Sequence, residues 1–554
     1  MKQLYAASLL SGLVLLLGAA AARRCGPQTP PLPLTTLPPS RTGQSTLQLA
    51  TYADVGTLDP ATSGDGLSAL IFPSIYGSLF EIDDTGVLTP YLAQSYSSNA
   101  DSRVYTFQLR PGLRFHDGSA FTAATFVASF ERAAGPHSIA MSDGAFEHVL
   151  GLAEFRAGTA QHIRGVEALR SGELRVSLTR SDARFLSLSM LPAMRPVCPS
   201  AAAPTSTEFA PCGAGAFAVA PGGWVRGREL TMHRTHAESP PFIPNVEAVR
   251  WQFQTSSNTQ RVLFLRGDLD MVGEVSYVDD MVLRAEPKWR NLLQFEPSRE
   301  VYGEIMNTRM APFDNVHIRR AVSYAIDRRK FERIKPGSMQ GTAFPLPAAV
   351  IEDLAQLPCQ YYDPTEALRE MELAGYPYNP RTGAGGYPHT IPYLVYAQGV
   401  GEYSAQVVAR DLEKIGLRVE IRVLSYQAYL AQAQRSGGSA ISFGGWATDV
   451  PDAAAFLKPL FHSSAISAED SSNAAFYANS LVDAALDEAI ATSDAGMRHN
   501  ALARAIHTLC EDAPWAFTFS LRAGIYTQGY VRGFRAHPAT RYWPFHTSLV
   551  GGAP

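Results

Sequence analysis

The pair His116-Asp117 is the part of the chain most easily interpreted as acid–base chemistry, because an imidazole beside a carboxylate can move a proton near neutral pH. The two residues are consecutive, however, and consecutive side chains of a strand point to opposite faces. They would therefore make a poor dyad. Asp117-Gly118 is also favourable turn chemistry. We assign the pair to structure rather than to catalysis.

Sequence signatures of common enzymes are absent from the chain. It contains no H-E-x-x-H, no G-x-S-x-G, no S-x-x-K and no Walker A loop. The other histidines lack the spacing of metal ligands. The sequence therefore predicts a protein that is not an enzyme, with no catalytic residue, no metal and no cofactor, and an exported hydrolase is the least favoured function.

The cysteines suggest covalent cross-links. Cys198 and Cys212 flank a loop with little else to hold it. A disulfide closing about 15 residues would contribute roughly 3 kcal/mol in the chain-entropy model. Metal binding is the alternative for this pair, but no C-x-x-C and no paired histidine lies nearby. We expect the Cys198–Cys212 disulfide. Cys359 and Cys510 could pair or could be ordinary buried thiols.

The N-terminus predicts export. Residues 1–22 combine Lys2 with an uncharged, mostly apolar run and an Ala-x-Ala end, which is the pattern of a signal peptide. An uncleaved anchor helix is the alternative. A Pro-rich tether follows at 23–44. Cys25 is a candidate lipidation site, although Arg24 stands where a lipobox has a small residue. We expect a protein that is periplasmic or tethered to the outer face of a membrane.

Length and charge restrict the function further. The chain has 554 residues, of which 46% are hydrophobic, so it is too long for one ordinary domain. Its net charge is -4, and no run of Lys and Arg forms a basic patch. We therefore expect no nucleic-acid partner.

Helical and strand-like segments alternate along the chain, which is typical of an α/β fold. Alternating apolar residues predict strands, and amphipathic runs with capping residues predict helices. Gly416 should end a helix because it can adopt a left-handed conformation. The expected strands are 105–109, 173–180, 246–254 and 391–399; a strand pair with a Gly-rich turn spans 211–235; helices are expected from Thr122 to Arg132, over 259–266 and 317–334, and on both sides of a strand within 402–433.

Five segments, in order, resemble the extracytoplasmic solute-binding proteins of the peptide/nickel (family 5) class of ABC importers. The resemblance covers about 47–545. Ala120 and Thr125 depart from it, since the family prefers Pro and Asp there. The segments are GVLTPYLAQSYSSNADSRVYTFQLRPGLRFHDGSAFTAATFVASFER, NTRMAPFDNVHIRRAVSYAIDRRKF, YYDPTEALREMELAGYP, GGWATDVPDAAAFLKPLF and GYVRGFRAHP.

The resemblance implies an α/β fold with mixed sheets, a two-lobed clamp with an extra inserted domain and a hinge between the lobes. Ligand would bind between the lobes, and hinge closure would bury it. Mapped onto this chain, lobe I is 45–90, 205–300 and 521–554, the inserted domain is 91–204, and lobe II is 301–520.

The resemblance also implies ligand-binding residues. Asp449, in the Gly-Trp-x-x-Asp segment, would pair with the α-ammonium of a peptide, because a buried carboxylate fixes the position of a cation. A helix cap for the segment that follows is the alternative role of Asp449. Trp446 is either a wall of the pocket or a core residue. Gly444 and Gly445 would allow the ligand backbone to approach closely.

The strand 391–399 should face the same cleft, which makes Tyr396, Gln398 and Tyr403 candidates. Peptide binders commonly have a basic residue after this strand for the ligand carboxylate, and this chain has none before Arg410. That departure leaves recognition of a free carboxylate in doubt. Tyr76 is a weaker candidate whose type and surroundings favour packing.

The expected function is therefore that of a monomeric receptor that captures peptides and delivers them to a membrane permease. A non-peptide solute, either sugar-like or a nickel-type chelate, is an alternative ligand. A sensor that binds without transport is an alternative role.

Overall fold

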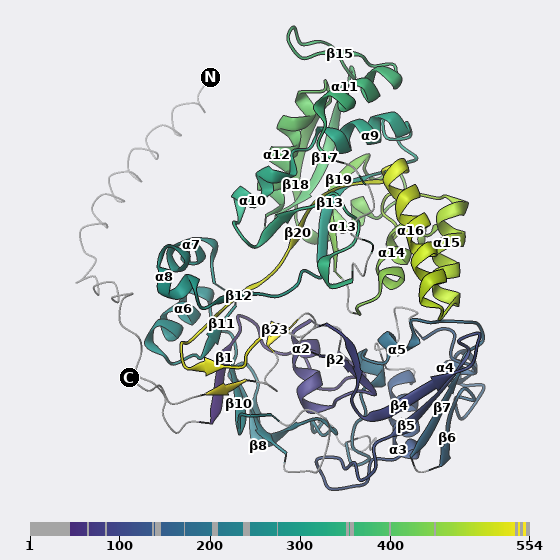
Figure 1. Cartoon of the computed structure of the whole chain (residues 1–554), viewed down its shortest axis with the longest axis vertical. Coiled ribbons are helices and arrows are strands. Elements are labelled where there is room, and N and C mark those ends of the chain that lie inside the picture. The colour runs from purple at the N-terminus through teal and green to yellow at the C-terminus, as the bar shows by residue number, and fades with distance from the viewer. Residues whose placement is uncertain are drawn as a thin grey trace, which may run out of the picture. The chain divides into compact units, whose positions relative to one another are not determined.

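The computed structural model describes residues 45–549 with internal gaps (Figure 1). The predicted signal peptide, the predicted tether and Cys25 lie outside the described residues. Among the helices that are described, none is long and apolar enough to cross a bilayer. The gaps are 64–65, 84–85, 136–137, 139–145, 171, 202–208, 236–243, 274, 351–353, 355–358, 360, 398–399, 448–449, 538–540 and 543–546.

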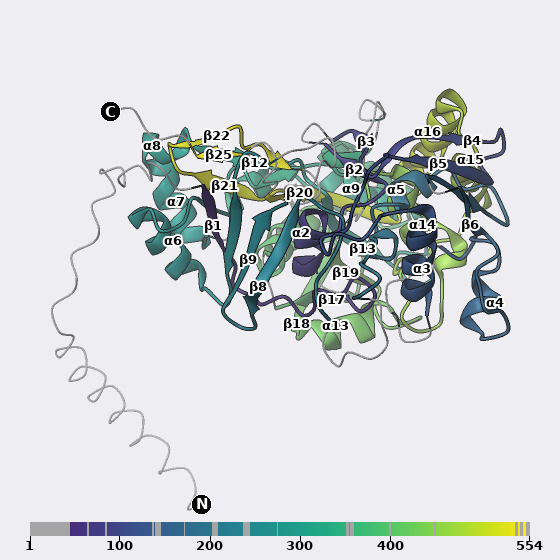
Figure 2. The same cartoon turned by 90° about the horizontal axis from the view of Figure 1, so that it is seen from below.

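A four-stranded sheet near the N-terminus has the order β1-β10-β9-β8. β1 (Thr46–Ala50) pairs in parallel with β10 (Ala248–Gln252), and β9 (Glu229–Arg234) and β8 (Phe217–Val225) continue the sheet as antiparallel neighbours. Figure 2 labels β1, β9 and β8 of this sheet. Its core includes Leu47, Trp251 and residues of α2 (Gly66–Ile75). β2 (Phe80–Ile82) and β3 (Leu88–Pro90) form a separate antiparallel pair.

A second four-stranded sheet, β4-β5-β7-β6, lies within residues 91–204. The core of this part of the chain includes the aromatic side chains of Tyr105, Phe107 and Phe185. The helix after β5 begins with a capping box in which Thr122 and Thr125 bond reciprocally to each other's backbone. The elements are β4 (Ala93–Ser98), β5 (Val104–Leu109), α3 (Ala123–Ala134), α4 (Leu152–Arg156), β6 (Val166–Arg170), β7 (Glu173–Ser177) and α5 (Phe185–Leu188).

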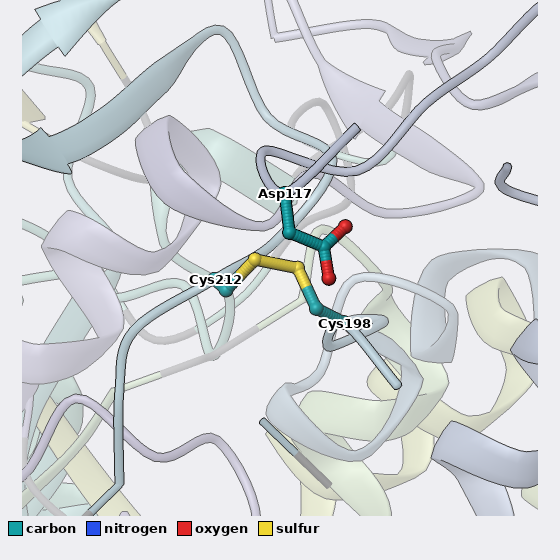
Figure 3. Close-up of side chains that lie close together, drawn as sticks. All are labelled: Asp117, Cys198 and Cys212. Carbon is teal, nitrogen blue, oxygen red and sulfur yellow. A yellow bond between two sulfur atoms is a disulfide. The ribbon is translucent and has the colours of Figure 1, made fainter. Parts of the chain in front are cut away.

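The predicted Cys198–Cys212 disulfide is present in this part of the chain (Figure 3). Asp117 lies beside it, and its carboxylate accepts hydrogen bonds from the Ser119 and Ser200 hydroxyls at 2.6 and 2.7 Å. A zinc site would need thiolates, so the disulfide removes the metal alternative for these cysteines. His116 is half-buried, and its ring hydrogen-bonds to the carbonyl oxygen of Gly215 at 2.9 Å. His116 and Asp117 therefore have different structural partners.

A mixed six-stranded sheet with the order β14-β20-β13-β19-β17-β18 forms the centre of residues 300–521. Helices α9, α11 and α12 belong to one buried core beside the sheet, and α14–α16 belong to another. The strands are β13 (Glu300–Met306), β14 (Met339–Gly341), β17 (Thr390–Tyr396), β18 (Arg418–Leu424), β19 (Ile441–Ala447) and β20 (Trp515–Leu521); the helices are α9 (Val316–Ala325), α10 (Phe331–Ile334), α11 (Pro364–Leu373), α12 (Gly401–Glu413), α13 (Tyr426–Ala433), α14 (Ala453–Phe461), α15 (Ser480–Ala491) and α16 (Ala495–Asp512).

A three-stranded sheet, β11-β21-β12, unites distant parts of the sequence. Trp289, Phe264 and Tyr526 pack together in its core. The ring centroids of Phe264 and Trp289 are 5.0 Å apart. Its elements are α6 (Ser257–Arg266), β11 (Met271–Val272), α7 (Tyr277–Ala285), α8 (Pro287–Arg290), β12 (Leu293–Phe295) and β21 (Gly524–Thr527). Three short pairs complete the described strands: β15 (Tyr378–Asn379) with β16 (Ala384–Gly385), β22 (Val531–Arg532) with β25 (Ser548–Leu549), and β23 (Ala536–His537) with β24 (Arg541–Tyr542).

Two short crossing segments join this three-stranded sheet to the six-stranded sheet. Residues 296–299 lead from β12 to β13, and residues 522–523 lead from β20 to β21. The segments run side by side, because the Glu296 N–H donates to the Ala523 carbonyl and the Ser298 hydroxyl donates to the Leu521 carbonyl at 2.8 Å. We call 296–299 and 522–523 the crossing segments.

Two elements differ from the sequence expectation. The amphipathic run 317–334 is not one helix: α9 ends at Ala325, and the buried Arg328 guanidinium then donates to the Ser323 and Ile326 carbonyls that the helix end leaves free. In 211–235, Gly222 and Gly223 lie in a bulge within β8 rather than in the turn, which falls at 226–228 around Gly227.

The cysteines that the sequence left open are also joined. Cys359 forms a disulfide with Cys510 of α16, across 151 positions of sequence. This bond attaches the segment before α11 to α16, the last of the described helices.

Candidate ligand-binding site

The carboxyl ends of three strands meet at one edge of the six-stranded sheet. β17 is parallel to both β18 and β19, so the residues that follow all three strands come together there. The antiparallel neighbour β13 begins at the same edge, with Glu300 opposite Ala447 on one side and Leu521 on the other. The carboxyl edge of parallel strands is the usual ligand position in open α/β sheets. We call it the binding edge.

The binding edge brings together several residues that the sequence singled out. Tyr396 is the last residue of β17, and Gly444, Gly445 and Trp446 lie near the end of β19. Asp449 and Gln398 lie outside the described residues, so their roles stay predictions. The strands that precede them, β19 and β17, both end at this edge.

The alternative role of Asp449 as a helix cap is wrong. The N-cap of α14 is Asp452, whose carboxylate accepts from the Ala455 N–H at 2.8 Å. The same carboxylate is paired with Arg498 at 2.5 Å. The cap position is therefore occupied by another residue.

Packing within the protein accounts for both glycines of β19. A Cβ at Gly445 would lie 2.3 Å from the Tyr302 ring, and one at Gly444 would lie 2.6 Å from the Ile305 side chain. Neither position tolerates a side chain without moving its neighbour. Gly445 is nevertheless exposed, so a ligand backbone can approach it closely. Trp446 is half-buried and packs against the core of α14–α16, which leaves both interpretations of its ring open.

An aromatic cluster from the sheet and from α13 supports the binding edge. Tyr396 contacts Tyr426, Tyr429 and Phe443, with ring centroids 5.4, 5.1 and 5.7 Å apart. Tyr302 stacks on Phe443 at 5.8 Å. Burial raises the pKa of Tyr396 to about 12, so its hydroxyl stays neutral and can donate a hydrogen bond at physiological pH.

The two remaining tyrosine candidates lie in different environments. Tyr403, on α12, has an exposed fraction of 64% and is free to contact a solute. Tyr76 is completely buried, and its hydroxyl donates to the Leu58 carbonyl oxygen. Its contacts are those of a packing residue, and we leave it out of the proposed site.

A charged pocket lies beside the crossing segments. We call it the crossing pocket; it is lined by Glu296, Glu300, Lys335, Ser338, Arg522 and Gly524, among others. Sequence analysis did not select any of these residues. The sequence contained one clue to them. Glu300 and Arg522 are charged residues next to the expected boundaries of lobe II, where the chain passes between the lobes.

A buried carboxyl lies deeper in the sheet. Glu304 of β13 has no exposed surface and accepts a hydrogen bond from the Tyr393 hydroxyl, while none of the described residues forms a hydrogen bond with its other oxygen. Burial raises the pKa of Glu304 to about 8. This residue is therefore a pH-sensitive part of the scaffold behind the binding edge.

Comparison with known proteins identifies the fold and the family. The family model "Bacterial extracellular solute-binding proteins, family 5 Middle" matches residues 87–468. The chain is 25% identical over 493 residues to the glutathione-binding protein GsiB of Pectobacterium atrosepticum, with 88% of this chain and 90% of that protein covered.

Two solved structures have the same fold. The unliganded open form of MppA, a periplasmic murein tripeptide binding protein, has a TM-score of 0.77 at 20% identity, covering 92% of this chain and 98% of that one. DppA from Helicobacter pylori in complex with the peptide STSA has a TM-score of 0.70 at 22% identity, covering 91% and 98%. The mixed α/β fold with several mixed sheets is that of two-lobed periplasmic binding proteins.

Proposed function

The chain belongs to the bacterial extracellular solute-binding proteins of family 5, and we propose that it is the peptide receptor of an ABC importer. The match of the family model over 87–468 carries this proposal. Similar proteins are described as binding glutathione, a murein tripeptide and the peptide STSA. Its relatives are binding proteins rather than enzymes, and so is this chain.

The binding edge is the proposed contact surface for the peptide. Asp449 pairs with the α-ammonium, and Tyr396, Gln398, Trp446 and Tyr403 line the groove beside it. The convergence of β17, β18 and β19 supports this arrangement, because all three strands deliver their following loops to one place. Main-chain hydrogen bonds hold the rest of an extended peptide.

Capture depends on movement about the crossing segments. In the proposed division, lobe I comprises 45–90, 205–300 and 521–554, with 91–204 inserted, and lobe II comprises 301–520. A peptide that contacts both lobes binds the closed state more tightly than the open one, so it shifts the population toward closure. The closed receptor, a monomer exported to the periplasm or tethered at the membrane, then delivers the peptide to a permease.

Native mass spectrometry of the exported protein, purified without denaturation, tests the proposal. The expected result is one unmodified peptide per chain, released on unfolding. Retention of a sugar-like solute or a metal chelate would contradict the peptide assignment. Failure to retain or bind any solute of any class would contradict the receptor function itself.

A further inference from the structure

The crossing pocket contains opposite charges that are not paired with each other. Glu300 lies opposite Leu521 in the strand register, and Arg522 is the next residue. Both side chains line the pocket, yet no N–O distance within 4.0 Å joins these two described residues. Opposite charges that share a half-buried pocket without pairing favour a ligand that carries both complementary charges.

The Arg522 guanidinium is held in place by its surroundings. Its Nε donates to the Gly337 carbonyl at 2.8 Å, and its carbon lies 4.3 Å from the centre of the Phe295 ring. The guanidinium carbon of Arg284 lies 5.0 Å from the centre of the same ring, but Arg284 forms an ion pair with Asp280, with 2.8 Å between its Nε and the Asp280 Oδ2. Within the described residues, no carboxylate pairs with Arg522. Its fork of N–H donors suits a carboxylate.

Glu300 is held in a similar way. The Tyr302 hydroxyl donates to its Oε2 at 2.7 Å, which fixes the carboxylate and leaves its other oxygen without a hydrogen bond from any described donor. A half-buried carboxylate in this position is suited to an ammonium group.

The size of the pocket suits the end of a molecule rather than a whole peptide. Its volume is about 220 Å³, which is below the roughly 300–1,000 Å³ of pockets that enclose a drug-sized ligand. That volume accommodates one charged head group. Ser338 and Gly524 also line this pocket.

We propose that the crossing pocket binds a zwitterionic α-amino-acid head group, with the ligand carboxylate on Arg522 and the ligand ammonium on Glu300, whereas an α-linked peptide places its ammonium on Asp449. This proposal rests on the proposed function and names a class of substrate for it: solutes that keep both charged groups on one carbon, as γ-linked glutamyl peptides do. Arg522 would also provide the basic residue for a ligand carboxylate. Such a residue is missing from the strand 391–399 and from the loop that follows it.

Two isomeric dipeptides give the sharpest test. γ-Glu-Leu keeps its α-ammonium and α-carboxylate on one carbon, whereas α-Glu-Leu separates them, although the atoms are the same. Isothermal titration calorimetry of the full chain should show γ-Glu-Leu binding at least about tenfold more tightly, the scale of a charge-assisted hydrogen bond. N-acetyl-γ-Glu-Leu should lose that advantage.

Variants locate the preference in the pocket. Arg522→Gln and Glu300→Gln should each abolish the preference for the γ isomer and leave the weaker affinity for α-Glu-Leu nearly unchanged. Arg435→Gln, at an exposed residue outside the pocket, should keep the preference. Thermal unfolding checks that the variants fold, and Arg522→Lys, which keeps the charge but loses the fork, should restore part of the preference.

Equal affinity of the wild-type protein for the two isomers would overturn this inference, as would an equal loss for both isomers in Arg522→Gln. If α-linked peptides bind without a γ preference, the proposed function stands and only the head-group site is wrong. If no peptide binds, both proposals are wrong.

Discussion

At the scale of single residues, Asp449 should set affinity for a free amine. Asp449→Ala should lose at least about 2 kcal/mol of binding free energy for α-linked peptides with a free N-terminus, the scale for breaking a buried charge pair. The same peptides with an acetylated N-terminus should bind wild type and variant alike. Calorimetry with matched free and acetylated peptides measures this difference, and unchanged affinity for the free peptide would contradict the assignment.

Glu304 should make stability depend on pH. Burial raises its pKa to about 8 from the ordinary value of 4.5, so between these values the folded protein holds a proton that the unfolded chain releases. The free energy of unfolding should therefore fall as pH rises through this window, by an amount on the order of a few kcal/mol. Denaturant titrations at pH 5 and pH 8 measure the change.

Glu304→Gln is the matched control for that measurement, because the amide keeps the shape of the side chain and cannot ionise. The pH dependence of the variant should be flatter than that of the wild type over the same window. Parallel curves for the two proteins would show that Glu304 does not titrate there.

At the scale of elements, the two disulfides should differ in their effects. The chain-entropy model gives about 3 kcal/mol for the Cys198–Cys212 separation of 14 residues and about 5 kcal/mol for the Cys359–Cys510 separation of 151. Double Cys→Ser variants should therefore lose more unfolding free energy for the longer loop. A larger loss for Cys198 and Cys212 would contradict this ranking.

Local signals in the sequence predicted several elements well. Thr122 begins α3 with a side-chain cap, and Gly416, with φ of 78°, ends the helix before β18. Both depend on neighbours within a few positions. The division of 317–334 depends instead on the Arg328 contacts with the helix end and with β20, which no local pattern contains.

The candidate site was only partly predictable for the same reason. The resemblance selected Tyr396 and Trp446, and strand register brings their strands together. Arg522 and Glu300 are adjacent only because β20 and β13 pair, although more than 200 positions separate them in the sequence. Pairing over such a distance is a property of the folded sheet rather than of either segment.

At the scale of the whole molecule, peptide binding should make the protein more compact. Closure about the crossing segments brings the proposed lobes together, so the radius of gyration should decrease when saturating peptide is added. Small-angle X-ray scattering measures this directly. Asp449→Ala at the same peptide concentration is the control and should stay closer to the ligand-free curve. Superimposable curves for the free and the saturated wild-type protein would contradict closure.

The central claim is that this member of family 5 is a receptor for peptides. Calorimetric titration of the ligand-free protein with a panel of short peptides, followed by mass spectrometry of the recovered ligand, tests it most directly. We predict saturable binding of one peptide per chain, with the peptide recovered intact. Absence of binding across the panel, or recovery of a cleaved peptide, would contradict the account.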